Sequence, residues 1–425
     1  MRKLIIAALF VVALPLRATE SEMNFARAML DDAIIRNDVA GIDLARERIL
    51  HIAADADDRN VVRDAYYLAA LSALFESFTG ECDVRRCAKV VTDGIRHADR
   101  AIEIDPQFAD AWVIAAMLRS GAVRWGVIPP KDPPGTPNRL MHAMQLDPKS
   151  PPVAFFNALI HSFNPAGAAP PEGVKLFDDL VERLDAERAA TGRPFALWDA
   201  EAHAWQVMVR RASDDPRAET LRPMAAKVIA LRPDFELGQN IAASVAERKF
   251  VAPPSVAWQP FLTDAANDGK DPKLPDVISV ERAADSDRLW FRITFREALP
   301  RSFGTNLVIN RNGDSSGMRW WGTGSTFTFD RLVTAYISRD GDRYFGNVGV
   351  TDDVGARGAR LTKISTDVSI AMGDDNRSVM IGVPRAALDL TPKSTMLVAG
   401  GSNLIWNDDT PAALISPEAP TPPAH

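Results

Sequence analysis

The stretch NLVINRNGDSSGMRWWGTGSTFTFD, residues Asn306–Asp330, decides the fold of the C-terminal half. It places an apolar run and an alternating run on either side of a turn made of Asn, Gly, Asp and Ser, which is typical of neighbouring β-strands. Just upstream, apolar residues occupy every second position from Leu289 to Phe295. This period of two predicts a half-buried strand.

Short strands continue at regular spacing on both sides of this stretch, with turn residues between them. The other expected strands are Leu307–Ile309, Arg319–Trp321, Thr326–Phe329, Leu332–Ser338, Tyr344–Val350, Leu361–Met372, Ser378–Val383 and Thr395–Ala399. This pattern predicts an antiparallel, jelly-roll-like β-sandwich over residues 276–412. Residues 251–275 are rich in Pro, Asp and Gly and read as a linker, and the Pro-rich residues 413–425 read as a disordered tail.

Residues 22–250 follow the helical period instead, because their apolar residues recur at three- and four-residue spacing. The expected helices are Met23–Ile35, Ile42–Ala53, Val61–Phe78, Val84–Ile104, Phe108–Ser120, Pro137–Leu146, Val153–Phe163, Gly173–Ala190, Phe195–Arg211, Glu219–Leu231 and Phe235–Glu247. Three of them end in a similar way before Pro106, Pro148 and Pro233. The first two of these prolines are 42 residues apart and the last two are 85 apart, close to twice that distance, so the half contains an internal repeat.

The repeat resembles the tetratricopeptide family, in which an Ala-rich second helix closes each unit and a proline precedes the next unit. Ala98, Ala101, Pro106, Trp112 and Ala115 fit that pattern, although the spacing is longer than the usual unit. The resemblance implies an α-α helical array of stacked pairs, with a curved surface that binds peptides or a protein partner.

The β half resembles the family 9 carbohydrate-binding modules and the related DOMON-like domains. The resemblance rests on the turn Asn310–Asp314, the following Gly317 and Trp320-Trp321, and the later Trp406-Asn407. It implies a sandwich that binds sugars or, in some DOMON members, haem. Haem is disfavoured because residues 255–424 contain no histidine to serve as an axial ligand.

A sugar site needs an exposed aromatic ring to stack on the sugar and polar groups to bond its hydroxyls. Its candidate residues are Trp320, Trp321, Tyr344, Trp406 and Asn407. Neighbouring residues of a strand face opposite sides, so only one of the two adjacent tryptophans can lie on a given face. The alternative is that all these aromatic residues belong to the core.

The turn itself suggests a calcium loop, since Asn310, Asn312 and Asp314 place oxygen atoms at alternate positions. Only one of the three is a carboxylate, and an ordinary turn in which Asn and Gly accept a positive φ is the competing interpretation. No other cofactor is expected.

The sequence contains no complete catalytic constellation. Gly313–Gly317 matches G-x-S-x-G, but a β pattern follows it and His425 is the one histidine downstream. A nucleophile elbow requires a following helix and a base, so a hydrolase of this kind is excluded. An enzyme that uses two facing carboxylates remains an alternative without a sequence pattern to support it, and we expect a protein that is not an enzyme.

The first residues and the composition indicate an exported protein. Residues 1–18 have the basic start, apolar run and small closing residue of a signal peptide, with no lipoprotein cysteine after it. We therefore expect a periplasmic or secreted protein without a transmembrane segment after signal removal. In an oxidising compartment Cys82 and Cys87 are expected to form a local disulfide. A formal net charge of -7 gives no basic footprint for nucleic acid.

These expectations combine into an exported, non-enzymatic binding protein. The helical repeats would recruit a protein partner, and the sandwich would bind a carbohydrate. The alternative is a structural or assembly factor of the cell envelope that uses both domains for protein contacts and has no ligand site in the sandwich.

Overall fold

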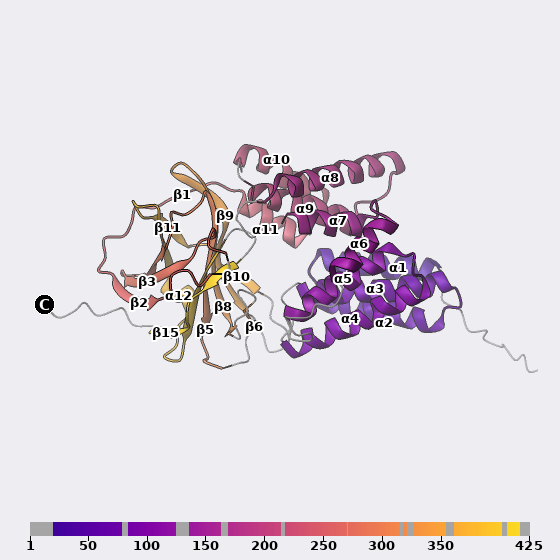
Figure 1. The fold of residues 1–425 in the computed structure, drawn as a ribbon, viewed down its shortest axis with the longest axis horizontal. Helices are drawn as coiled ribbons and strands as arrows, with labels where there is room; N and C mark the ends of the chain where they lie inside the picture. The colour runs from indigo at the N-terminus through magenta and orange to yellow at the C-terminus, as the bar shows by residue number, and fades with distance from the viewer. Residues whose placement is uncertain are drawn as a thin grey trace, which may run out of the picture.

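The computed structural model describes residues 20–78, 84–124, 136–162, 169–213, 217–269, 271–314, 318–320, 327–353, 361–401 and 406–416. Helices make up the N-terminal half and antiparallel sheets make up the C-terminal half (Figure 1). The predicted architecture, an α-helical array followed by a two-sheet β domain, is confirmed.

All the helices expected between residues 22 and 250 are present, with ends that differ by a few residues. They are α1 (Glu20–Ile35), α2 (Val39–Asp55), α3 (Arg59–Phe78), α4 (Val84–Ile104), α5 (Ala109–Arg124), α6 (Thr136–Leu146), α7 (Pro151–His161), α8 (Pro171–Thr191), α9 (Leu197–Arg211), α10 (Ala218–Leu231) and α11 (Glu236–Ser244). Local chemistry fixes several ends. The side chain of Asp38 accepts a hydrogen bond from the Gly41 amide at the start of α2, and Gly192 ends α8 at a φ of 66°.

The odd-numbered helices form a continuous inner layer of the array. Each of α1, α3, α5, α7 and α9 contacts the next odd-numbered helix, and each also packs against its neighbour in the sequence. This is the arrangement that stacked helix pairs produce, because one helix of every pair faces the concave side.

The two ends of the array are joined to each other. Helix α1 contacts α9, and Asp32 of α1 forms an ion pair with Arg232, which follows α10. A second, longer pair joins Arg36, which follows α1, to Asp234 at 4.0 Å. The described helices therefore close around an inner space rather than extending as an open superhelix.

The C-terminal half is a sandwich of two antiparallel sheets. Sheet A has the order β1-β9-β8-β5-β13-β14, with β10 paired to β9 and β15 to β13, and sheet B has the order β11-β12-β4-β3-β2. The strands are β1 (Arg248–Lys249), β2 (Gln259–Thr263), β3 (Val277–Ala284), β4 (Arg288–Phe295), β5 (Ser302–Asn310), β6 (Met318–Arg319), β7 (Thr328–Phe329), β8 (Arg331–Asp340), β9 (Arg343–Asp353), β10 (Leu361–Ser365), β11 (Ser369–Met372), β12 (Ser378–Pro384), β13 (Thr395–Gly401), β14 (Trp406–Asp409) and β15 (Ala413–Leu414). Apolar residues of both sheets, among them Phe291 and Leu307, share one buried cluster.

Strand β9 joins the sandwich to the helical array. Its neighbouring residues face opposite sides, so Tyr344 belongs to the sandwich core while Phe345 belongs to the core cluster of the helices. The Ser338 hydroxyl donates a hydrogen bond to the Arg211 carbonyl at 3.2 Å, and Glu247 pairs with Arg343 at 3.2 Å. The two halves thus share buried side chains as well as surface ion pairs.

Two parts of the chain are more ordered than the sequence suggests. The stretch 251–275, expected as a linker, contains β2, which pairs with β3. The start of the expected tail forms β15, which pairs with β13, and Ile415 is buried. A short helix, α12 (Arg385–Leu388), was also not expected.

Several predictions concern residues outside the described part of the chain. The signal peptide, residues 1–18, and Cys82 are among them. Cys87 is buried on α4, and its pairing with Cys82 stays a prediction. Within the described residues, no helix combines the length and the apolar character that a membrane span requires.

Candidate functional site

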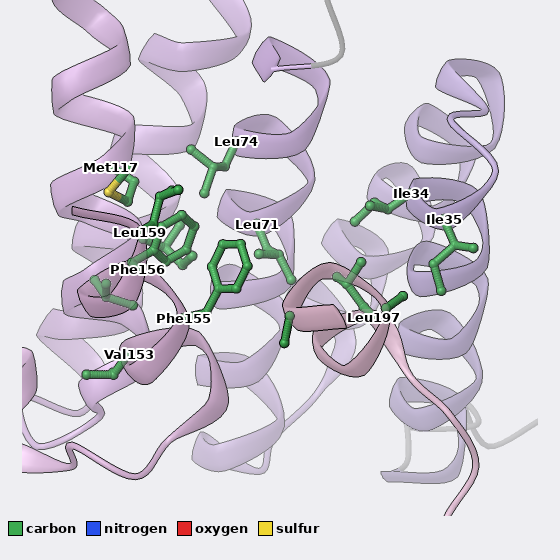
Figure 2. Packing of buried hydrophobic residues seen from close by; sticks show 14 of the residues in the cluster. Ile34, Ile35, Leu71, Leu74, Met117, Val153, Phe155, Phe156, Leu159 and Leu197 are labelled. Atoms are coloured by element: carbon green, nitrogen blue, oxygen red, sulfur yellow. The ribbon is translucent and has the colours of Figure 1, made fainter. Parts of the chain in front are cut away.

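A cavity of about 390 Å³ lies inside the helical array, where its first and last helices meet. Side chains from α1, α3, α7, α9 and α11 line it. Its apolar wall includes Ile34, Leu74, Phe155, Phe156, Leu159 and Phe235. Figure 2 shows Phe155 and Phe156 beside Leu74, with Ile34 and Ile35 on the separate helix α1. The volume and the apolar wall are those of a site for a small ligand or for side chains of a partner, since such sites span roughly 300–1,000 Å³.

Helix α7 supplies three apolar residues of the wall because its sequence, PPVAFFNALIH, is apolar almost throughout. A proline at its first positions starts the helix directly after the preceding turn. The two adjacent rings of Phe155 and Phe156 pack edge to face with centroids 5.1 Å apart, and Phe155 also contacts Trp198 and Trp205 of α9. The wall is therefore a packed aromatic surface held by two helices.

Glu201 introduces a carboxyl group into this apolar wall. Its residue is 7% exposed, and its side chain is hydrogen bonded to Trp205 one turn further along α9. Burial raises the pKa of the Glu201 carboxyl to about 7, although the hydrogen bond to Trp205 lowers it. The mouth of the cavity is more polar, with Asn37, Glu236 and Asn240 around it.

The lining can bind a ligand but offers little for catalysis. The described lining residues contain two carboxylates and no histidine, lysine, arginine, serine or cysteine. An apolar wall with a single buried carboxyl group suits an apolar side chain that carries a hydrogen-bond donor.

Trp320, Tyr344 and Asn407, the predicted sugar-binding residues whose side chains the structure describes, do not form an exposed platform. Trp320 is 2% exposed and covers the outer face of sheet A together with Phe329 and Leu332, while its indole Nε1 donates to the Asp409 carboxylate at 3.0 Å. Trp320 is thus a core residue, which corrects its assignment as a stacking residue.

Tyr344 is likewise buried, at 2% exposure, and its ring lies 4.8 Å from that of Phe250. It fills the sandwich core, so its assignment as a sugar platform is also corrected. Asn407 is 1% exposed and has a structural task, because its side chain accepts a hydrogen bond from the Asp271 amide and donates one to the Pro275 carbonyl. Trp321 and the side chain of Trp406 lie outside the described part.

The predicted calcium loop is stabilised by its own hydrogen bonds. Asn310 accepts from the Gly313 amide at 2.7 Å and donates to the Asp314 carbonyl at 2.6 Å, while Asn312 donates to Asp330. The fold brings Asp330 next to the loop, but the guanidinium of Arg311 pairs with it.

Arg311 also pairs with Asp352 at 2.8 Å, and Arg331 approaches the same carboxylate at 2.9 Å. Positive charge is therefore already present where a calcium ion would need carboxylates. The geometry supports the competing interpretation, an ordinary turn in which Gly313 has a φ of 68°.

No protein-family model matches the chain, and no curated protein matches it. The case for a function therefore rests on the geometry of the molecule.

One feature of the sequence, the apolar character of α7, could have indicated the cavity. Helix α7 is apolar around most of its circumference, and a helix of this kind must be covered on all sides or border a cavity. Glu201 was a second signal, since it lies among the apolar positions of α9 that face inward. What could not be read from the sequence is that α1 and α11 meet α7 at one place.

Proposed function

We propose that this chain is an exported binding protein whose helical array recruits a protein partner through the cavity between α1, α3, α7, α9 and α11. The observation that carries the proposal is the apolar cavity on the inner layer of helices, with Glu201 in its wall. The likeness of the array to tetratricopeptide repeats supports it, since such arrays use the concave layer for peptides.

The chemistry of the wall defines the part of the partner that enters. An aromatic or long aliphatic side chain would fill the apolar volume, and a donor such as an indole N–H or an ammonium group would meet Glu201. The polar mouth at Asn37 and Asn240 would then bond the backbone of the bound segment.

In this proposal the sandwich holds the array in place through β9 and contributes no sugar site at Trp320 or Tyr344. The burial of these two residues supports the assembly-factor alternative for the β half. Sugar binding there stays a prediction that depends on Trp321 and Trp406.

The proposal is tested by selecting peptides from a random displayed library on the immobilised full-length protein and measuring their Kd. Asn240→Trp places a bulky side chain over the cavity mouth, and Gln239→Trp places the same side chain at the neighbouring exposed position of α11. Asn240→Trp should weaken binding by about tenfold or more, as loss of an anchor contact does, while Gln239→Trp should leave it unchanged. Failure to enrich any peptide, or equal binding by both variants, would contradict the proposal.

A further inference from the structure

The loop after β2 and strand β14 bring several aspartates together on the sandwich. Asp264, Asp268 and Asp408 each place a carboxylate oxygen within 4.8 Å of the other two. Asp264 follows β2, Asp268 lies four residues on, and Asp408 belongs to β14 in the other sheet. Asp408 is more than a hundred residues from the other two in the sequence, so the fold itself builds the cluster.

Asp276 adds a fourth carboxylate that lacks a partner for one of its oxygens. The residue is 2% exposed, and within the described part of the chain its Oδ1 atom accepts no hydrogen bond. That oxygen lies 3.3 Å from where a Cβ at Gly269 would be, beside Asp268. Its other oxygen is satisfied by the Asn267 amide at 2.8 Å and by Arg296 at 3.2 Å.

Asp264 also has a carboxylate oxygen without a donor, because its Oδ2 atom is buried and has no described hydrogen-bond partner. A buried carboxylate oxygen without a donor is costly, and two such oxygens on the neighbouring residues Asp264 and Asp276 favour a bound positive charge.

We propose that Asp264, Asp268 and Asp408 form a calcium-binding site, with Asp276 as a neighbouring buried carboxylate. The ligands are all oxygen atoms, which hard cations prefer over the nitrogen and sulfur that zinc favours. Oxygens on opposite sides of a calcium ion lie up to about 5 Å apart, because each Ca–O distance is roughly 2.3–2.6 Å. The shorter Mg–O distance of roughly 2.0–2.1 Å would require the cluster to contract.

The site would connect the two sheets at the point where Asn407 already attaches the loop 264–276 to β14 through Asp271 and Pro275. Arg296 balances one of the four negative charges, and Asp409, bonded to Trp320, contributes another nearby. Among the residues that the structure describes the surplus is negative, so a divalent cation suits the site better than a monovalent one.

The test is a calorimetric Ca²⁺ titration of the full-length protein after chelation and desalting, with thermal unfolding followed in parallel. We expect one calcium per chain with a Kd of roughly 10 µM to 1 mM, from the weakest sensor sites to the extracellular modules, and a rise in Tm with calcium. Mg²⁺ at the same concentration should raise Tm less.

Asp408→Asn should abolish the calcium response, and Asp268→Asn, at an exposed position that tolerates change, should weaken binding by about fivefold or more. Asp314→Asn, in the turn that the sequence suggested for calcium, should bind as the unmodified chain does. The proposal is overturned if calcium produces neither heat nor a Tm shift, if Mg²⁺ acts equally, or if Asp314→Asn removes binding while Asp268→Asn does not.

Discussion

At the scale of single residues, Glu201 shows how burial changes the behaviour of an ordinary carboxyl group. Its pKa is raised to about 7 in the folded protein, so the folded state holds a proton that the unfolded chain releases near its usual pKa. The free energy of unfolding should therefore fall as pH rises toward 7.

We expect Glu201→Gln to remove this fall. Relative to the variant, the unmodified protein should lose about 3 kcal/mol of stability as the pH rises from 4.5, the usual pKa of the group, to about 7, its pKa in the folded protein. Urea unfolding at several pH values measures it, with Glu236→Gln at the cavity mouth as the control that keeps the pH dependence. Parallel pH curves for the unmodified protein and Glu201→Gln would refute this explanation.

Gly346 is a second residue whose surroundings matter, because its backbone conformation and its close neighbour require a glycine. It has a φ of 152°, and a Cβ there would lie 1.7 Å from the carbonyl oxygen of Tyr336. Gly346→Ala should therefore destabilise the protein by more than about 2 kcal/mol. In Gly121→Ala, on α5, a Cβ meets nothing within 4 Å, and we expect a gain of up to about 1 kcal/mol from helix propensity. Thermal unfolding of both variants separates the two effects.

At the scale of elements, strand β15, which the sequence did not predict, allows a buried residue to be compared with its exposed neighbour. Ile415 is 1% exposed in the sandwich core, whereas its neighbour Leu414 is 68% exposed. Ile415→Ala should cost about 2–4 kcal/mol, and Leu414→Ala less than about 0.5 kcal/mol. Chemical denaturation measures both. Similar values for the two variants would mean that the chain after residue 412 is not part of the folded domain.

The helices were predictable because the 3.6-residue period persists through each of them and prolines mark the repeats. Strand β2 was missed for a local reason: Pro260 lies within it, and proline usually argues against a strand. The structure accepts Pro260 because β2 is the last strand of sheet B, where an amide is not needed on the open side.

The candidate sites were harder to predict because they depend on which elements meet. The aromatic residues chosen for sugar binding, such as Trp320, were chosen by type, and the core requires the same type. The cavity and the aspartate cluster each combine segments more than a hundred residues apart, and no local pattern records that distance.

At the scale of the whole molecule, β9 couples the two halves. Because Phe345 is buried among the helices while Tyr344 fills the sandwich, unfolding of one half exposes apolar surface of the other. We expect a single calorimetric transition for the unmodified protein and two separated transitions for Phe345→Ala.

Phe291→Ala is the matched control, because Phe291 lies between the two sheets and away from the helices. This variant also removes a buried phenyl ring and should lower the free energy of unfolding by about 3–5 kcal/mol and lower Tm. The transition should stay single. Two transitions in the unmodified protein would show that the halves fold independently.

The ion pairs that join α1 to the chain after α10 have a mechanical consequence. An open helical array behaves like a spring, whose pitch changes when a ligand enters or when force is applied to its ends. Here Asp32 and Arg232 connect the beginning of the array to its end, so the pitch cannot change without breaking that connection. These contacts favour a cavity of nearly constant size, and under the proposed function a partner would be selected by what fits it rather than by how far the array opens.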